Sequence, residues 1–328
     1  MNGKPVCFEP GRKLPEVFSG VPSFLGLPVA VSAGDLEGYD FAVLGAPWEG
    51  ACTTGVFTGC ENATKTIRKA STRYGGYLPE YDFDIFDRFS GCDYGDIAVR
   101  NGDVDFTFGR ARKAMAEILS AGAIPITFGG DHSLSYPLIE AFAEKYGGRI
   151  GILHFDAHMD NMDTFGDDCY ARCCPFHRVY DIAGFNPQNL VSIGIRGPRN
   201  HYSALAEAKK YGASVITALE VKQNGYMAAI EKALGIAKQG TDAIYVTVCS
   251  DALDVAHLPG GPPDPCGLTS FELSQMLYHS GLGGAMGFDF TEIYPPGDLC
   301  GTSSHVACWM AIYTMSGIAQ RMFKDRPR

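Results

Sequence analysis

Short apolar runs alternate with stretches of helical periodicity along most of this 328-residue chain. The runs are rich in β-branched and aromatic residues and have few polar positions, which is typical of strands buried on both faces of a sheet. They occupy 41–45, 124–128, 150–155, 190–195, 214–216, 244–248 and 285–290. Amphipathic helices, several ending at glycine, are predicted near 104–119, 134–145, 202–210, 227–238 and 306–322. This alternation predicts an α/β fold with a mostly parallel central sheet between layers of helices.

Two predicted loops directly follow strands that carry polar motifs. They are the polar stretch 160–174 and the stretch 258–267, which is rich in proline and glycine. In open parallel sheets the ligand site lies beyond the carboxyl ends of the strands, so these loops should frame a site. Thr269 and Glu272 have the spacing of a capping box that starts a helix. No repeat or linker divides the chain, and we predict an N-terminal arm over residues 1–38 and a single domain over residues 39–328.

The charge balance limits the choice of ligand and location. The formal net charge is −10, with 46% hydrophobic and 20% charged residues. Because no basic stripe is present to neutralise phosphates, nucleic acid and anionic membrane are not expected partners, whereas small cationic ligands are compatible with the charge. The first residues lack a secretory pattern and no apolar run is long enough to span a bilayer, so a cytoplasmic location is expected.

The cysteines are expected to be thiols. Eleven is an odd number, and a chain without a secretory signal has no expected disulfide framework. Cys169, Cys173 and Cys174 form a cluster in sequence, but their spacing fits no common zinc knuckle. We interpret them as surface or packing thiols, with a metal site as the alternative.

Five candidate metal ligands follow three of the predicted strands: His132, Asp156, His158, Asp160 and Asp251. Mixed carboxylate and imidazole ligands suit manganese, nickel, zinc or iron better than magnesium or calcium. The set is large enough for two ions about 3.5 to 4 Å apart, a spacing at which a shared water becomes hydroxide near neutral pH. Each motif alone could be a hydrogen-bonded strand end. Together they would be costly to bury without a counter-ion, so the sequence favours a hydrolytic metal centre.

His154 precedes this motif by two positions. It lies within the predicted strand 150–155, so we expect a core residue, or one that supports a ligand, and not a ligand itself.

The order and spacing of these motifs resemble the ureohydrolase family of arginases, agmatinases and guanidine hydrolases. The likeness covers most of the chain. The early segment Gly20–Pro28 is similar to the arm of the agmatinase branch. The motifs that carry the resemblance are Gly45-Ala46-Pro47-Trp48-Glu49, Asp93-Tyr94-Gly95-Asp96 (similar to a turn in the family), Gly129-Gly130-Asp131-His132-Ser133, His154-Phe155-Asp156-Ala157-His158-Met159-Asp160, Asp251 with Leu253-Asp254 and Pro259-Gly260, Gly267-Leu268-Thr269-Ser270, and Phe288-Asp289-Phe290-Thr291-Glu292.

The resemblance implies a three-layer α/β/α, arginase-like fold with a central sheet of about eight strands. It also implies two divalent ions, nickel or manganese, whose hydroxide attacks a guanidinium carbon and releases urea. His132 and Asp160 would hold one ion and His158 the other, with Asp156 bridging them. Asp251 matches the second aspartate of a family motif. Asp156 and Asp160 would thus be catalytic, as would Glu292, which matches the glutamate that receives the cationic guanidino substrate.

Cys249 departs from the family pattern. Alignment of the neighbouring motifs places it where the family has an aspartate that bridges both metals. Cysteine removes a negative charge unless the thiol ionises, and it has a shorter reach. Two adjacent cations could lower the thiol pKa and make Cys249 a thiolate bridge to nickel or zinc.

Arg172 is a second and independent departure. It occupies the position of a family histidine thought to shuttle protons or contact substrate, and arginine cannot act as a base at neutral pH. Pointing inward, Arg172 would repel a guanidinium and could pair with Glu292 in the substrate position. On a rearranged loop it would instead face solvent.

Two hypotheses follow from the residues and the resemblance. The favoured one is a catalytically impaired subunit that supports an active homologous subunit in a trimer or hexamer, since the family forms such oligomers. Nickel-dependent guanidine and biguanide hydrolases, including metformin hydrolases that pair an active with a degenerate chain, are the closest setting. The other is a self-sufficient hydrolase with a cysteine bridge. A histone-deacetylase-like enzyme and a cysteine-nucleophile amidinohydrolase built on Cys249 rank lower.

Overall fold

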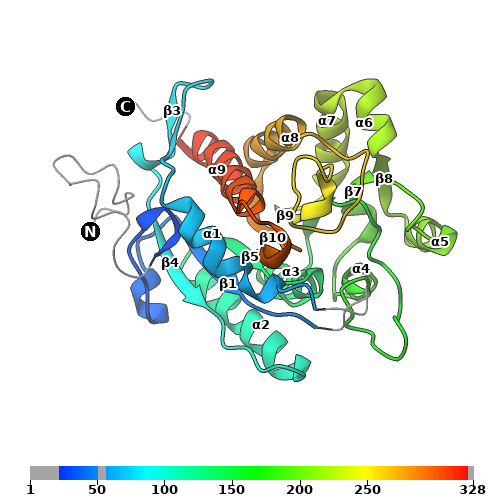
Figure 1. Ribbon diagram of the computed structural model, residues 1–328, viewed down its shortest axis with the longest axis horizontal. Helices are drawn as coiled ribbons and strands as arrows, with labels where there is room; N and C mark the ends of the chain where they lie inside the picture. Colours follow the sequence, from blue (N-terminus) through cyan, green and yellow to red (C-terminus); the bar gives the residue numbers. More distant parts are fainter. Residues whose placement is uncertain (1–21, 51–56, 324–328) are drawn as a thin grey trace.

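The computed structural model describes residues 22–50 and 57–323, and within them an eight-stranded sheet forms the centre of the molecule (Figure 1). The strand order is β4-β1-β5-β10-β9-β6-β7-β8, and every pairing in this sheet is parallel. A short antiparallel pair, β2 and β3, stands apart from it. The strands are β1 (Phe41–Ala46), β2 (Tyr77–Leu78), β3 (Phe83–Asp84), β4 (Gly91–Asp96), β5 (Ile124–Gly129), β6 (Ile150–Phe155), β7 (Leu190–Ile195), β8 (Ser214–Thr217), β9 (Ala243–Cys249) and β10 (Ala285–Thr291).

Helices cover both faces of the sheet, so the predicted three-layer α/β fold is confirmed. In Figure 1 α2, α3 and α4 lie below the strands, and α7, α8 and α9 lie above them. The helices are α1 (Ala63–Ser71), α2 (Val104–Ser120), α3 (Ser135–Lys145), α4 (Pro175–Tyr180), α5 (Tyr202–Tyr211), α6 (Ala218–Asn224), α7 (Tyr226–Ala237), α8 (Ser270–Gly283) and α9 (Thr302–Phe323). The capping box predicted at Thr269 and Glu272 starts α8. No helix of the described part of the chain has the length and apolarity needed to cross a bilayer.

Alternation along the strands divides the core into two clusters. Val43 and Phe155 point toward the layer with α7, α8 and α9, while Leu44 and Ile152 point toward the layer with α2 and α3. All these side chains are almost fully buried. Burial on both faces explains why the central strands are nearly continuous apolar runs in the sequence.

The edge strand β4 was not predicted, and the interpretation of its Asp-X-Gly-Asp segment as a turn was wrong. The strand is polar because Asp93 and Asp96 form ion pairs with Arg68 of α1. Arg68 is 8% exposed and also bonds the carbonyl of Gly95. A buried ion pair between distant segments therefore replaces the apolar pattern that identifies the other strands.

The described part of the predicted N-terminal arm packs against the domain. Phe24 and Leu25 are fully buried, and the backbone N–H of each donates to a side chain of the domain, Asp93 and Ser71 respectively. Residues 1–21, with most of the predicted arm, lie outside the described residues.

Helices α8 and α9 pack closely where Gly317 meets Tyr278. A Cβ added at Gly317 would lie 2.0 Å from the carbonyl oxygen of Tyr278. We expect Gly317→Ala to lower the free energy of unfolding by about 1–3 kcal/mol, because the backbones must separate. Gly235→Ala on α7 is the matched control, since no atom lies within 4 Å of the added Cβ there. It should stabilise by roughly 0.5–1 kcal/mol. Chemical denaturation of both variants tests this, and equal effects would contradict it.

Candidate metal centre

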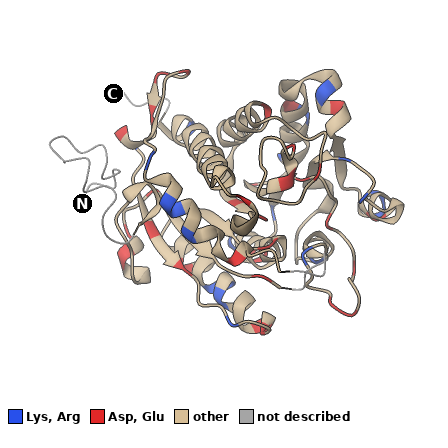
Figure 2. Ribbon diagram, in the orientation of Figure 1, with Lys and Arg blue, Asp and Glu red and all other residues tan. Residues whose placement is uncertain are grey.

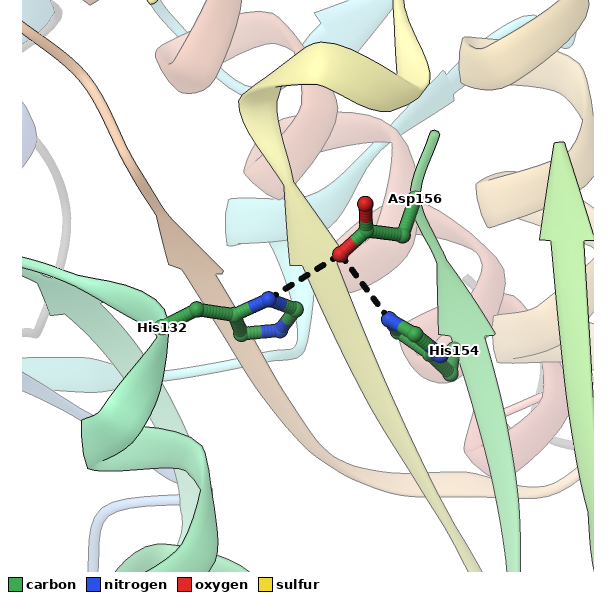
Figure 3. A group of neighbouring side chains, drawn as sticks. All are labelled: His132, His154 and Asp156. Carbon is green, nitrogen blue, oxygen red and sulfur yellow. Dashed lines mark hydrogen bonds and ion pairs between the residues drawn. The ribbon is translucent and has the colours of Figure 1, made fainter. Parts of the chain in front are cut away.

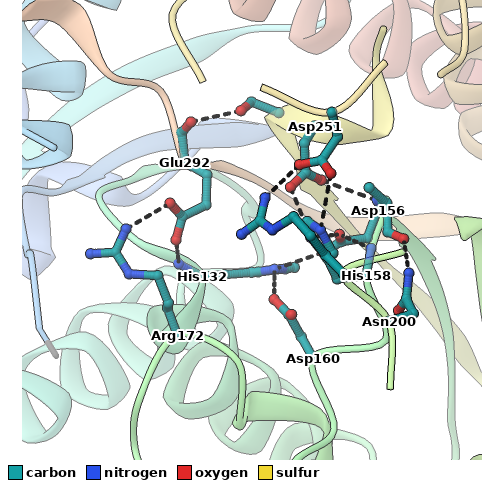
Figure 4. Close-up of polar contacts among 12 residues, drawn as sticks. His132, Asp156, His158, Asp160, Arg172, Asn200, Asp251 and Glu292 are labelled. Carbon is teal, nitrogen blue, oxygen red and sulfur yellow. Dashed lines mark hydrogen bonds and ion pairs between the residues drawn. The ribbon is translucent and has the colours of Figure 1, made fainter. Parts of the chain in front are cut away.

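Four neighbouring strands of the sheet, β5, β10, β9 and β6, bring the candidate ligands together at their carboxyl ends (Figure 4). His132 begins a 3-10 turn (His132–Leu134) after β5, and Asp251 lies in another (Ser250–Ala252) after β9. Asp156 follows β6, and Glu292 follows β10. In Figure 2 acidic segments occur at these strand ends, while most basic residues lie on the helices.

Asp156 lies between the two candidate histidine ligands. Its Oδ2 is 3.0 Å from Nδ1 of His132, and its Oδ1 is 3.4 Å from Nδ1 of His158. Asp160 Oδ2 lies 2.9 Å from the same nitrogen of His132, and Asp251 Oδ2 lies 3.1 Å from that of His158. The five residues thus form two groups that share the carboxylate of Asp156. We call them the half-sites, one with His132 and Asp160 and the other with His158 and Asp251.

His154 supports this carboxylate from within β6 (Figure 3). Its Nε2 lies 3.0 Å from Oδ2 of Asp156, and its Nδ1 lies 3.0 Å from the hydroxyl of Ser192. Burial lowers the pKa of His154, so a neutral ring donates one hydrogen bond to Asp156. This agrees with the prediction that His154 is a buried strand residue.

Two site residues have a strained backbone. Asp160 has φ 43° and Glu292 has φ 62°, the left-handed region that residues with a Cβ rarely adopt. Such strain persists only where the surroundings hold the residue in place, and it concentrates at functional sites. Both side chains are thereby turned toward the cluster.

The charges of the cluster fit a pair of cations. Burial opposes charge on His132 and lowers its pKa, but Asp156 and Asp160 outweigh this and raise it well above the usual value. The pKa of His158 is raised in the same way against burial, chiefly by Asp251. Burial raises the pKa of Asp251 to about 6, with Asp156 adding to the effect. Protonated histidines thus provide the positive charge that divalent ions would provide, and the donors are of the mixed type that manganese, nickel or zinc accept.

Cys249 ends β9 and lines a cavity of about 290 Å³. The thiol is buried, and burial raises its pKa well above the usual value, with Asp156 and Asp251 raising it further. In this arrangement the thiol is neutral. Cys249 therefore adds no negative charge to the shared region, where the family resemblance calls for a carboxylate.

Arg172 points inward and is 5% exposed, so the solvent-facing alternative is excluded. Its Nη1 lies 3.0 Å from Oε2 of Glu292, and its Nη2 lies 3.4 Å from Glu49 and 3.7 Å from Asp131. The other oxygen of Glu292 accepts the backbone N–H of His132. Both oxygens of the carboxylate that the resemblance assigns to a substrate guanidinium are therefore engaged by groups of the chain itself.

Three residues near the site were given no role in the sequence analysis, although Glu49 ends one of its motifs. Tyr294 donates a hydrogen bond to Glu292 and contacts Arg172, Glu49 accepts from the loop at Thr58, and Asp264 lies 3.5 Å from Nε2 of His158. Asp264 falls in the predicted loop 258–267, but nothing in its local sequence indicates a role.

The cysteine cluster forms no metal site among the described residues. Cys173 and Cys174 have sulfur atoms 3.9 Å apart, and neither belongs to a group of converging ligands in the part of the chain that is described. The described cysteines are free, which agrees with the expected thiols.

Comparisons with known proteins identify the family. A model described as the arginase family matches residues 39–317. Human mitochondrial guanidino acid hydrolase is 32% identical over 292 residues, which are 88% of this chain and 80% of that protein. The structure of proclavaminate amidinohydrolase from Streptomyces clavuligerus superposes with a TM-score of 0.85 at 28% identity, over 93% of this chain and 99% of that one. This chain belongs to the arginase, or ureohydrolase, family.

A more distant structure shows the same fold. Trypanosoma cruzi formiminoglutamase with Mn²⁺ has a TM-score of 0.82 at 22% identity, over 92% of this chain and 100% of that one.

Restoring a carboxylate at position 249 should strengthen metal binding. Cys249→Asp adds a negative charge between the two half-sites, and ligand charge governs affinity for divalent ions. We expect the weaker of two Mn²⁺ ions to bind roughly tenfold or more tightly, as measured by chelator competition. Cys249→Ser is the control, because it keeps a small neutral side chain and should bind as the parent does. Equal affinity of the Asp and Ser variants would contradict the prediction.

Proposed function

We propose that this chain is a ureohydrolase-type subunit of an enzyme that cleaves a guanidino or biguanide compound to urea and an amine. Its own centre is impaired, and it supports an active homologous subunit in a mixed trimer or hexamer. The observation that carries this proposal is the Arg172–Glu292 ion pair. Relatives that act on guanidino compounds, such as guanidinopropionase and agmatinase, support the substrate class.

The guanidinium of Arg172 blocks the substrate position in this proposal. A planar cation binds best to a carboxylate whose two oxygens are free to accept two parallel N–H groups. Glu292 has neither oxygen free, and the fixed charge of Arg172 would repel a second guanidinium at this distance. Substrate could bind only after Arg172 has moved, and its guanidinium would then need other hydrogen-bond acceptors.

The proposed metal content follows from the half-sites. His132, Asp160 and Asp156 would hold one divalent ion, and His158, Asp251 and Asp156 would hold the other, with manganese or nickel as candidates. When bound, the pair supplies a hydroxide at neutral pH for attack on the guanidinium carbon. If the thiol of Cys249 stays protonated beside the ions, the pair lacks one shared negative charge and is weaker.

The second candidate is a self-sufficient guanidino-compound hydrolase. The observation that favours it is the survival of three ligands in each half-site with their nitrogens and oxygens converging. Cys249 would then ionise between two cations and act as the bridge. The cytoplasmic location is proposed under either candidate, and the mixed oligomer only under the first.

Urea release separates the two candidates. The purified chain, loaded with Mn²⁺ or Ni²⁺, is assayed with guanidine, agmatine, guanidinobutyrate and metformin, alone and mixed with a co-encoded homologue. The impaired-subunit proposal expects urea only from the mixture. Urea from the chain alone, with about two ions bound per chain, would overturn it in favour of the second candidate.

Removing the Arg172 guanidinium should open a site for exogenous guanidinium. We expect Arg172→Ala to bind guanidinium and agmatine with at least a roughly tenfold lower Kd than the parent, because a buried carboxylate left without a partner favours a new cation. Isothermal titration calorimetry measures the affinity. Arg172→Lys keeps the charge and is the control, so it should bind no better than the parent. Binding by neither variant would show that Arg172 is not what blocks the position.

A further inference from the structure

The two candidate histidine ligands have different groups behind them. Nε2 of His132 lies 3.3 Å from the hydroxyl of Thr247, which donates a hydrogen bond to Asp289. Nε2 of His158 instead lies 3.5 Å from Oδ1 of Asp264. Nε2 thus faces a neutral hydroxyl in His132 and a carboxylate in His158.

The two rings also differ in how the fold holds them. The His132 ring is fully buried and packs against the rings of His154 and Phe176. His158 lies beyond the end of β6, and its side chain is 14% exposed at the cavity. The orientation of His158 therefore depends more on its polar neighbours than on packing.

Asp264 is fixed from two sides. Its Oδ2 accepts a 2.6 Å hydrogen bond from Arg199, which leaves Oδ1 facing His158. Arg196 donates to the backbone carbonyls of Asp264 and Pro265, both at 2.8 Å. The loop 258–267 is thereby held to the segment that follows β7, and Asp264 is only 6% exposed.

Nε2 of His158 and Oδ1 of Asp264 lie near each other without forming a hydrogen bond. Nε2 of His158 is buried and has no hydrogen-bond partner. Its distance of 3.5 Å to Oδ1 exceeds a normal N–H···O distance by about half an ångström. A buried donor without an acceptor is unfavourable, and Asp264 is the group placed to satisfy it.

We propose that Asp264, held by Arg199, is a positioning residue that fixes the ring of His158 with Nδ1 toward Asp156 and Asp251. It thereby sets the affinity of the ion position that His158 serves. A carboxylate that accepts the second N–H of a metal-binding imidazole orients the ring and makes it a better ligand. The proposal rests on the proposed function only in taking His158 as a metal ligand.

The test measures how many Mn²⁺ ions the full chain binds and the Kd of each. Asp264→Asn keeps the size of the side chain and removes its charge. Chelator competition gives the Kd of each ion, and the electron paramagnetic resonance spectrum distinguishes a coupled ion pair from a single ion. We expect one of the two ions, that of the His158 position, to be lost about 10–100-fold more readily in Asp264→Asn, with the other ion changed less than threefold and a single-ion spectrum replacing the coupled one.

Three further variants complete the experiment. Asp264→Ser removes the carboxylate with different packing and should show the same selective loss. Asp264→Glu keeps the carboxylate and should retain both ions. Asp163→Asn is a control for the loss of one carboxylate elsewhere on the chain, since Asp163 lies in the loop 160–174 and pairs with Arg178, and it should behave as the parent does.

The outcomes separate this inference from the proposed function. Unchanged binding in both Asp264→Asn and Asp264→Ser, while the parent holds two ions, overturns the positioning role alone. Equal weakening of both ions also overturns it. A loss of charge acts on both ion positions, whereas a loss of ring orientation at His158 acts on one. A parent chain that binds no Mn²⁺ overturns the proposed metal centre and this inference together. Melting temperatures of the metal-free variants within a few degrees of the parent show that folding is intact.

Discussion

The burial of several carboxylates at one end of the sheet is the constraint on which the centre of this protein depends. Asp156, Asp251 and Glu292 are almost fully buried, and an unpaired buried charge costs several kcal/mol, a large part of the net stability of a fold. Cations must accompany them. Protonated His132 pairs with Asp156 and protonated His158 pairs with Asp251. Arg172 pairs with Glu292.

The two departures from the family pattern act on different parts of this balance. Cys249 replaces the aspartate of the family pattern by a thiol whose pKa burial, Asp156 and Asp251 raise. Arg172 adds a positive charge at the carboxylate that would receive a guanidinium. Both changes make the site more positive than the family pattern does. The chain keeps the fold of the family while both of these positions differ from the family pattern.

Strands and helices whose pattern reflects burial were predictable from the sequence. The seven predicted strands and five predicted helices all exist, because apolar runs and helical periodicity directly record which faces are buried. Strand β4 was missed, since its Asp93 and Asp96 pair with Arg68 instead of forming an apolar run. Such a pair joins residues 25 and 28 positions apart and leaves no local pattern. Helices α1, α4 and α6 and the short strands β2 and β3 were missed as well.

The sequence by itself determined the fold class, the family and the five residues that converge, because parallel strands end at one edge of the sheet whatever their side chains do. It also located Cys249 and Arg172 as departures. Only the tertiary structure decided that Arg172 turns inward and that Asp264 stands behind His158. The physical reason is that the direction of a long polar side chain is set by charges from distant segments. Arg172 meets Glu49, Asp131 and Glu292, which reach it from three different strand ends.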